Sequence, residues 1–435
     1  MSVNAMKPAK TRRPMSAWKA TIAVAMSNYI EAGAIIALAT SLSLWQGAFG
    51  FDDGMVGIIA ALSANAFGAA IGAMIGGPLC DRLGRKFIYT YDLIVFMVGA
   101  LMITFCTNLA LLLIGVILMG IAVGAGVPAS WTYIAEEAPS EQRAAHVGTA
   151  QLAWSIGPAI GFALAILVGP LGVTGSRIIF FHLFVIAAIT WWVRRGLPES
   201  TKWKEQRAEE IRTGAKVSFF SGVAGLLSER KNWGALAFLL GVYGLWNTVA
   251  GQSGIFQPRV YEAAGLESAT QQNLLQVLVW TLTAAATYFG FMRYGDRVSR
   301  RWLYFGGALL GVVAWVVLIF APPGMFSLFT FAICWGISAG LGAQAFYGLW
   351  TAELFATKYR ASAQGMLFML ARVMVGLLSL VFPVLLSSIG LTKLGLIILG
   401  LLVAALLIGT IWAPETRGKS LEEIEAERYG TKENA

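Results

Sequence analysis

The sequence predicts an all-α membrane protein of twelve transmembrane helices, arranged as two six-helix bundles with both termini in the cytoplasm. Three observations support this fold class. Of the 435 residues, 57% are hydrophobic and 13% are charged, whereas soluble domains carry about 25% charged residues. Twelve apolar stretches reach the roughly 18 residues that a membrane-spanning helix needs. The second half of the chain also repeats charged motifs of the first half.

The twelve apolar stretches form two groups of six on either side of a charged segment. They are residues 18–45, 54–79, 87–106, 109–134, 144–169 and 176–195, then 233–256, 271–292, 302–321, 325–351, 361–387 and 392–412. Within the charged segment, Glu205, Arg207, Glu209, Glu210 and Arg212 indicate a short surface helix. The predicted organisation is an N-terminal tail (1–16), a first bundle (17–195), a linker (196–232), a second bundle (233–412) and a C-terminal tail (413–435).

Lysine and arginine fall almost entirely on one side of this topology. With the N-terminus inside, 28 of the 32 lie in inner segments; Arg177, Arg259 and Lys393 lie in outer segments, and Arg372 lies within a span. Cytoplasmic loops of membrane proteins are enriched in these residues. The net charge of +9 therefore reflects membrane topology, and no nucleic-acid partner is predicted.

Three motifs recur at nearly one offset. The run Asp81-Arg82-Leu83-Gly84-Arg85-Lys86 returns as Asp296-Arg297-Val298-Ser299-Arg300-Arg301; the pair Glu136 and Arg143 returns as Glu353 and Arg360; and Pro198-Glu199 returns as Pro414-Glu415. The offsets are 215, 217 and 216 residues, about half of the chain. Parallel repeats of this kind build transporters whose substrate site lies between the two halves, at the membrane midplane.

Other chemistries have no motif to support them. Cys80, Cys106 and Cys334 show no CxxC spacing and are predicted to be small apolar filler. No metal site, cofactor, catalytic triad or GxxxxGK[ST] phosphate loop is predicted. The chain is therefore not expected to be an enzyme, and a gradient rather than ATP would drive any transport.

Several motifs resemble one transporter family. The run Gly77-Pro-Leu-Cys-Asp81-Arg82-Leu-Gly84-Arg85-Lys86 resembles the signature loop of the major facilitator superfamily, and Pro198-Glu-Ser-Thr, Pro414-Glu-Thr-Arg, Gln151-Leu152 and Pro258-Arg-Val-Tyr resemble its sugar porter branch. The stretches 57–65, Trp246-Asn247, 359–365 and 418–430 are similar to bacterial myo-inositol transporters of that branch.

The resemblance implies a secondary transporter that imports a sugar or cyclic polyol by proton symport with alternating access. The implied partners are the small-molecule substrate, protons and the lipid bilayer, and the protein is expected to work as a monomer in the bacterial inner membrane. A proton-coupled transporter of small organic anions is the alternative. A non-transporting membrane sensor is a more distant one.

The resemblance also implies a latch of charged residues that closes the inner ends of the two halves. Its predicted members are Gly77, Asp81, Arg82, Gly84, Arg85, Lys86, Glu136, Arg143, Asp296, Arg297, Arg300, Glu353 and Arg360. Several weak ion pairs would make the latch reversible, since an exposed pair contributes about 0–1 kcal/mol. The alternative is that these charges only set the topology.

Few ionisable residues lie inside the spans, where they are costly and usually functional. Glu31, in the first span, is the predicted proton-coupling residue; the alternative is a carboxylate that only bonds substrate or water. Sugar porters place an arginine of span 4 beside this acid, whereas this chain has Val116 there. Arg372 is predicted to bind a polyol, with pairing to Glu31 or another buried acid as the alternative. Asp92 is predicted to make a structural hydrogen bond.

A sugar site needs amides for hydroxyl groups and aromatic faces for the ring. The residues that offer these groups on apolar helices, together with Arg372, are Gln151, Trp154, Tyr243, Trp246, Asn247, Gln252, Gln344 and Trp350. Span 7 carries Leu245, Trp246 and Gly251 where sugar porters carry Gln, Gln and Asn. The sequence therefore favours a polyol other than a hexose.

Overall fold

The computed structural model describes residues 17–213 and 221–430, and every regular element in these ranges is helical. The predicted tail at 1–16, linker residues 214–220 and the last five residues of the predicted C-terminal tail lie outside the described residues. Eleven described segments are long and apolar enough to cross a membrane. The protein is therefore a multi-pass membrane protein.

The first part of the chain forms seven long or medium helices. They are α1 (Ala17–Phe49), α2 (Asp53–Leu62), α3 (Phe67–Leu83), α4 (Arg85–Thr104), α5 (Leu109–Glu137), α6 (Arg143–Val168) and α7 (Val173–Arg194). Polar side chains start two of them: Asp52 accepts from the Met55 N–H at α2, and Asn108 accepts from the Leu111 N–H at α5. Such caps satisfy backbone donors that a helix leaves unpaired at its start. Residues 63–66 interrupt the second predicted span, between α2 and α3.

The rest of the chain begins with α8 (Thr201–Thr213), the surface helix expected in the linker. It continues through α9 (Ser221–Ser228), α10 (Arg230–Leu239), a π-helical turn (Leu240–Gly244), α11 (Leu245–Ala263), α12 (Ala269–Ala285), a second π-helical turn (Ala286–Phe291), α13 (Met292–Tyr294), α14 (Arg300–Phe320), α15 (Met325–Leu341), α16 (Ala343–Leu354), α17 (Arg360–Ile411) and α18 (Leu421–Tyr429). A capping box of Ser420 and Glu423 starts α18.

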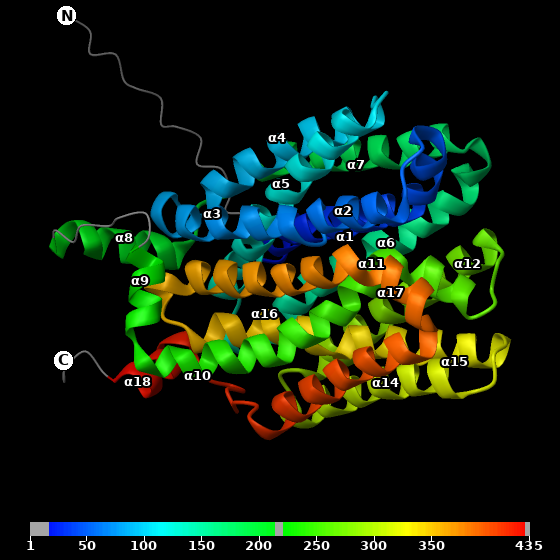
Figure 1. Cartoon of the computed structure of the whole chain (residues 1–435). Coiled ribbons are helices and arrows are strands. Elements are labelled where there is room, and N and C mark those ends of the chain that lie inside the picture. The colour runs from blue at the N-terminus through cyan, green and yellow to red at the C-terminus, as the bar shows by residue number, and fades with distance from the viewer. Residues whose placement is uncertain (1–16, 214–220, 431–435) are drawn as a thin grey trace, which may run out of the picture.

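The last membrane segment explains why eleven segments are found where twelve are predicted. The stretches predicted at 361–387 and 392–412 are joined in α17, which contains one non-helical residue, Gly390, with φ of 79°. Only glycine adopts this left-handed region readily. Figure 1 shows that the ribbon reverses its direction within α17. The segment therefore consists of two helices joined by a sharp turn.

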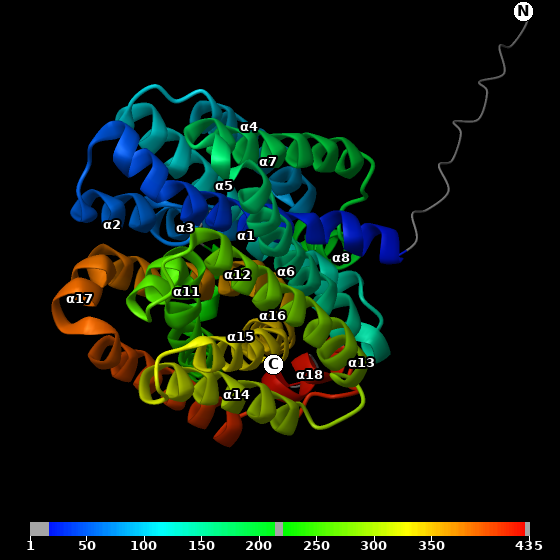
Figure 2. The same cartoon turned by 90° about the vertical axis from the view of Figure 1, so that its right-hand side faces the viewer.

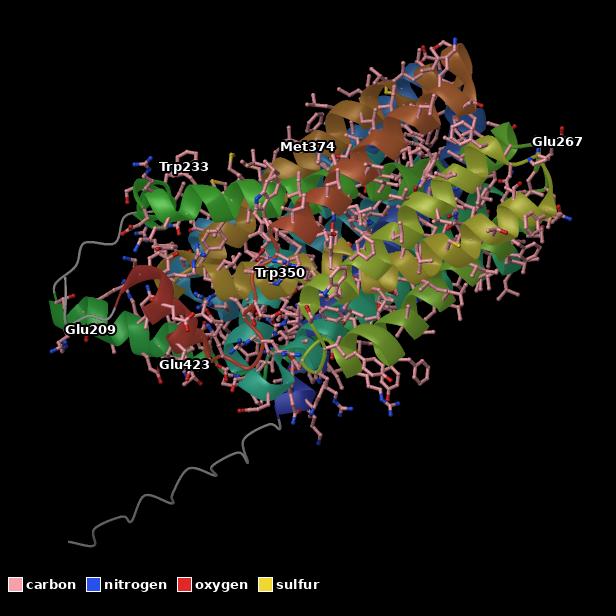
Figure 3. The ribbon with its side chains drawn as sticks, turned by 90° about the horizontal axis from the view of Figure 1, so that it is seen from below. Glu209, Trp233, Glu267, Trp350, Met374 and Glu423 are labelled. Atoms are coloured by element: carbon pink, nitrogen blue, oxygen red, sulfur yellow. The ribbon has the colours of Figure 1, made fainter. Side chains whose placement is uncertain are left out.

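The two parts of the chain lie face to face. Most of α1 to α7 lies in the upper part of Figure 2, with α11 to α18 in the lower part and α6 running down beside α12. Helices α8, α9 and α18 gather at the end that lies on the left of Figure 1, which we call the linker end. Figure 3 shows Glu209 and Glu423 at this end, and Glu267 at the opposite end. Contacts of α1 with α11, and of α3 with α17, join the two parts.

A glycine turn connects α3 to α4 at the linker end. Gly84 has φ of 97°, and a Cβ atom there would lie 2.2 Å from an oxygen of Glu199. That carboxylate accepts from the Arg85 N–H (2.9 Å) and the Lys86 N–H (3.0 Å). A remote carboxylate thus caps the start of α4, where the helix dipole favours negative charge. The turn needs glycine for both its conformation and its space.

Candidate functional site

A buried charged cluster stands where α3, α4 and α5 meet at the linker end. Arg85 donates to both oxygens of Glu136, with Nη2–Oε1 of 2.7 Å and Nε–Oε2 of 3.2 Å. Its Nη1 lies 3.6 Å from Asp81 Oδ1. Ser200 donates to Glu136 Oε2 over 2.6 Å. The Arg85 and Glu136 side chains are fully buried, so this fork-shaped pair is much less screened than a surface pair.

The second half of the chain repeats this cluster. Arg300 Nη1 donates to Glu353 Oε2 over 2.7 Å, and Arg300 Nη2 lies 3.4 Å from Asp296 Oδ1. Thr416 takes the place of Ser200 and donates to Glu353 Oε2 over 2.6 Å. Burial raises the pKa of the Asp296 carboxyl above its ordinary value, although the Arg300 guanidinium and the N–H groups of Ala144 and Ala145 lower it.

Each cluster also bonds to the opposite half. Arg143 Nη1 donates to Glu353 Oε1 over 3.0 Å, while Arg360 Nη1 lies 3.6 Å from Glu136 Oε1. The Ser362 N–H donates to Asp81 over 2.8 Å. In the equivalent place, the Ala144 N–H donates to Asp296 over 3.0 Å. We call these four cross-connections the latch; they close the linker end.

Close backbone contact accompanies the latch. A Cβ atom on Gly77 would lie 3.0 Å from the Ala361 carbonyl, and one on Gly365 would lie 2.8 Å from the Ala73 carbonyl. These glycines let α3 and α17 approach across the boundary. Arg82, Lys86 and Arg297, also predicted for the latch, are exposed. None of these three side chains is a member of the two clusters.

A second charged pair joins the halves far from the latch. Arg372 of α17 donates through Nη2 to Glu31 Oε1 of α1, and both side chains are at most 2% exposed. Arg372 Nη1 also donates to the Asn65 carbonyl over 3.1 Å and to Asn65 Oδ1 over 3.4 Å. The Phe368 ring lies 4.5 Å from the guanidinium carbon. The structure therefore pairs the acid of span 1 with an arginine from the other half of the chain.

A small cavity, which we call the central cavity, lies beside this pair. Its polar and aromatic lining consists of Asn65, Trp154, Asn247, Trp280 and Arg372. The space open to the centre of a water molecule is about 10 Å³, which is room for about one water. Trp154 and Trp280 meet edge to face across the halves, with centroids 5.1 Å apart. The cavity is thus closed around a site much smaller than a sugar.

Several residues that line this cavity carry buried polar atoms without partners. Within the described residues, Asn247 Nδ2, Trp280 Nε1 and Arg372 Nε are buried and have no hydrogen-bond partner. A buried donor left unpaired costs about 1–3 kcal/mol. Three such donors around one cavity suit a ligand rich in acceptors, such as a polyol.

The cavity gathers only part of the predicted substrate site. Trp154, Asn247 and Arg372 line it, whereas six other predicted residues are not in its lining. Gln151 donates to the Ala339 carbonyl of the other half (3.3 Å), and Gln252 donates to the Val375 carbonyl (3.0 Å). Gln344 is buried within α16.

The remaining three predicted residues belong to aromatic packing. Tyr243 stacks on Tyr347 at 3.9 Å, and Trp246 stacks with Trp335 at 6.5 Å. Trp350, labelled in Figure 3, packs on Phe238 of α10, with ring centroids 5.3 Å apart. These contacts match the interhelical packing that aromatic residues of spans often provide.

Two of the polar and aromatic lining residues, Asn65 and Trp280, are absent from the predicted site. Asn65 is an amide inside an apolar span, and that signal could have identified it. Trp280 carries no such signal, because one aromatic residue in an apolar helix is ordinary.

Asp92, predicted to be structural, accepts from the Leu93 N–H over 2.6 Å.

The end opposite the linker end is also bridged. Arg259 of α11 donates to Asp53 Oδ1 over 2.9 Å and to Gln46 Oε1 over 3.0 Å. The Arg259 and Asp53 side chains are 26% and 51% exposed, so this contact is weaker than the buried latch. With both ends bridged, the structure shows an occluded state.

The fold and the paired clusters are those of a membrane transporter with two related halves. A family model described as "Sugar (and other) transporter" matches residues 50–427, and the chain belongs to this family. The minor myo-inositol transporter IolF of Bacillus subtilis (strain 168) is 40% identical over 419 residues, covering 95% of this chain and 94% of IolF. These relatives are transporters and not enzymes.

Solved structures show the same fold. The proton:xylose symporter XylE, bound to 6-bromo-6-deoxy-D-glucose, superposes with a TM-score of 0.77 at 18% identity, covering 94% of this chain and 98% of XylE. The inward-open form of XylE from E. coli gives a TM-score of 0.67 at 19% identity. The human organic anion transporter MFSD10 (TETRAN) gives 0.70 at 16% identity, covering 91% of this chain and 100% of MFSD10.

Proposed function

We propose that this protein imports a cyclic polyol of the myo-inositol type by proton symport. The observation that carries the proposal is the buried Glu31–Arg372 pair, which joins the two halves beside a cavity lined by amide and indole groups. The similarity to a myo-inositol transporter over nearly the whole chain supports the substrate class.

The membrane topology is part of the proposal. A straight helix of the 52 residues in α17 would extend about 78 Å at 1.5 Å per residue, far beyond a bilayer of about 40–45 Å. We therefore count α17 as two crossings, which makes twelve. The linker end carries the cationic segments and faces the cytoplasm. Residues 17–195 and 233–412 act as the two moving bodies, and the protein works as a monomer in the bacterial inner membrane.

The coupling follows from the position of the Glu31–Arg372 pair. While Glu31 is ionised, its bond to Arg372 holds the two halves together at the centre. A proton on Glu31 removes the charge and frees the guanidinium, whose donors can then bind acceptor oxygens of the substrate. Loss of the proton to the cytoplasm restores the pair and expels the substrate. Proton and polyol thus cross together in each cycle.

Transport of a small organic anion is the second candidate. The observation in its favour is the buried guanidinium at the cavity, since such a fork binds carboxylates well. The Glu31 carboxylate already occupies that position in the occluded state. An anion would have to displace it, so we rank this function second.

Uptake of labelled myo-inositol into proteoliposomes tests the proposal. We expect an inward proton gradient to stimulate uptake by the wild type. Glu31→Gln should abolish the stimulation and retain exchange without a gradient, because the side chains proposed to bind the substrate remain. Asp92→Asn is the matched control, since Asp92 is also a buried carboxylate but does not line the central cavity.

The outcomes are distinct. Uptake that ignores the gradient would retain the polyol and refute proton coupling. Absence of polyol uptake, together with uptake of small carboxylates, would favour the anion transporter. If Asp92→Asn lost the gradient stimulation and Glu31→Gln kept it, Asp92 rather than Glu31 would carry the proton.

A further inference from the structure

The second membrane segment is broken at the level of the central cavity. Residues 63–66, Ser-Ala-Asn-Ala, are not helical and contain no glycine or proline. The Ser63 hydroxyl donates to the Ala60 carbonyl (2.8 Å) and accepts from the Asn65 N–H (3.0 Å). Irregular backbone inside a membrane is tolerated where it is buried in protein or lines a cavity. Asn65, in this break, lines the central cavity.

The side chain and the main-chain carbonyl of Asn65 form hydrogen bonds to the opposite half of the protein. Its Nδ2 donates to the Gly251 carbonyl of α11 over 2.9 Å. Its Oδ1 and its main-chain carbonyl accept from Arg372 Nη1 of α17. The residue is 1% exposed. A Cβ atom on Gly251 would lie 3.4 Å from Asn65 Nδ2 and 2.6 Å from Val375, so glycine keeps the opposing backbone within reach.

These bonds cannot persist when the halves part around a ligand. Separation would release the donor and the acceptor of one amide together, next to the Arg372 guanidinium. Buried polar groups carry a cost unless they find new partners. A cyclic polyol presents hydroxyl groups that both donate and accept on adjacent ring carbons, which matches the paired donor and acceptor of a side-chain amide.

We propose that Asn65 is a specificity-determining residue of the substrate site, where its amide binds two neighbouring hydroxyl groups of a cyclic polyol. In the occluded state the Gly251 carbonyl and the Arg372 guanidinium occupy the places of those hydroxyl groups. The inference rests on the proposed function, because it requires a polyol in the central cavity. It gives the broken second segment a role in substrate selection.

The chain offers a matched control for this amide. Asn28 of α1 is also fully buried, but its Nδ2 donates to Ser130 Oγ (3.1 Å) and its Oδ1 accepts from Trp131 Nε1 (2.6 Å), all within the first half. Removing Asn28 deletes buried amide bonds that do not themselves cross the boundary, and Asn28 does not line the cavity. Any change common to both variants is therefore structural.

The test is counterflow exchange of labelled myo-inositol by the full-length protein in liposomes, competed by myo-inositol and by inositols that each lack one hydroxyl group. For Asn65→Ala we expect the half-saturating concentration of myo-inositol to rise about tenfold or more, since one or two hydrogen bonds are lost. Discrimination against the deoxy analogues that lack a bound hydroxyl should disappear. Asn65→Ser, which keeps one polar group in the break, should be intermediate.

Asn28→Ala should retain the wild-type half-saturating concentration and selectivity, whatever its effect on yield or melting temperature. An Asn65→Ala protein with wild-type half-saturation and selectivity would overturn the inference, even if its maximal exchange rate changed, because Asn65 would then only join the halves. A wild type that exchanges no polyol would refute the proposed function itself, before any variant is compared.

Discussion

Replacing Arg143 by glutamine should open the linker end of the molecule. Arg143 Nη1 donates to Glu353 Oε1 and to the Lys419 carbonyl (3.1 Å). Glu353 keeps Arg300 and Thr416 as partners in its own half, so the substitution leaves no buried carboxylate unpaired. It removes a contact that exists only while the two halves are closed.

The size of the shift follows from that bond. A hydrogen bond between charged groups contributes about 1.5–3 kcal/mol, and 1.4 kcal/mol corresponds to a tenfold change in an equilibrium constant. Loss of the Arg143–Glu353 bond should therefore shift the balance between the closed and open linker end by roughly 10- to 140-fold toward the open form. Overall stability should fall less than for a change at Arg300, which joins helices of one half.

Distance measurements between spin labels can detect this shift. Glu141 and Lys358 are exposed, lie on opposite halves beside the latch, and can carry labels once Cys80, Cys106 and Cys334 have been replaced. We expect Arg143→Gln to populate longer distances than the wild type. Arg207→Gln is the control, because Arg207 pairs with Glu210 on the same helix, α8. Identical distance distributions for Arg143→Gln and the wild type would refute the role of the latch.

Three further substitutions have definite expectations. Gly84→Ala should destabilise the protein by about 1–3 kcal/mol, because alanine at φ of 97° is strained and its Cβ would clash with Glu199. Gly306→Ala, at a helical glycine with open space around it, is the control. Equal melting temperatures for the two variants would contradict the expected strain at Gly84. Arg259→Ala should change uptake only a few-fold, since its partly exposed pair with Asp53 contributes at most about 1 kcal/mol; a complete loss of uptake would show that this contact is essential. Lys202→Ala should have a small effect on stability that stays constant between about pH 5 and pH 10, because the hydrogen bond between Lys202 and Glu422 raises the pKa of Lys202 above 10.5 and lowers that of Glu422 below 4.5. The contribution of this bond is lost only as the pH falls through the lowered pKa of Glu422 or rises through the raised pKa of Lys202. Denaturation at several pH values would reveal any change near neutrality, which would contradict this.

The sequence predicts the membrane helices well because the bilayer sets their length. Apolar stretches must cover the hydrocarbon core, and local signals such as Asp52 and Asn108 mark where helices begin. The turn at Gly390 falls in the gap between the predicted stretches 361–387 and 392–412. The break at residues 63–66 is harder to predict, because it contains no glycine or proline.

The charged residues of the latch can be identified from the repeat, but their pairing cannot. Glu136 and Arg143 are seven residues apart, and the spacing recurs in Glu353 and Arg360. The structure places Arg143 against Glu353, and Arg360 near Glu136. The repeat gives each half the same donors and acceptors, and only the packing of one half on the other decides that partners are exchanged.

The substrate site shows the same limit. Amides and aromatic residues on apolar helices identify candidates, yet six of the nine predicted binding residues are not in the lining of the central cavity, and Asn65 and Trp280 are. A side chain on a buried helix faces either the cavity or a neighbouring helix. Rotation and tilt of the helix decide between them, and these depend on packing rather than on the side chain itself.

The sequence by itself determined that this chain crosses a membrane many times, that it is built from two related halves and that one side carries the cations. These properties depend on composition and on spacing along the chain, through the cost of placing polar groups in lipid. Only the tertiary structure decided that Glu31 pairs with Arg372, 341 residues away, and that Asn65 joins them. Such contacts arise from the docking of two separate halves, and no local pattern records which residues will meet.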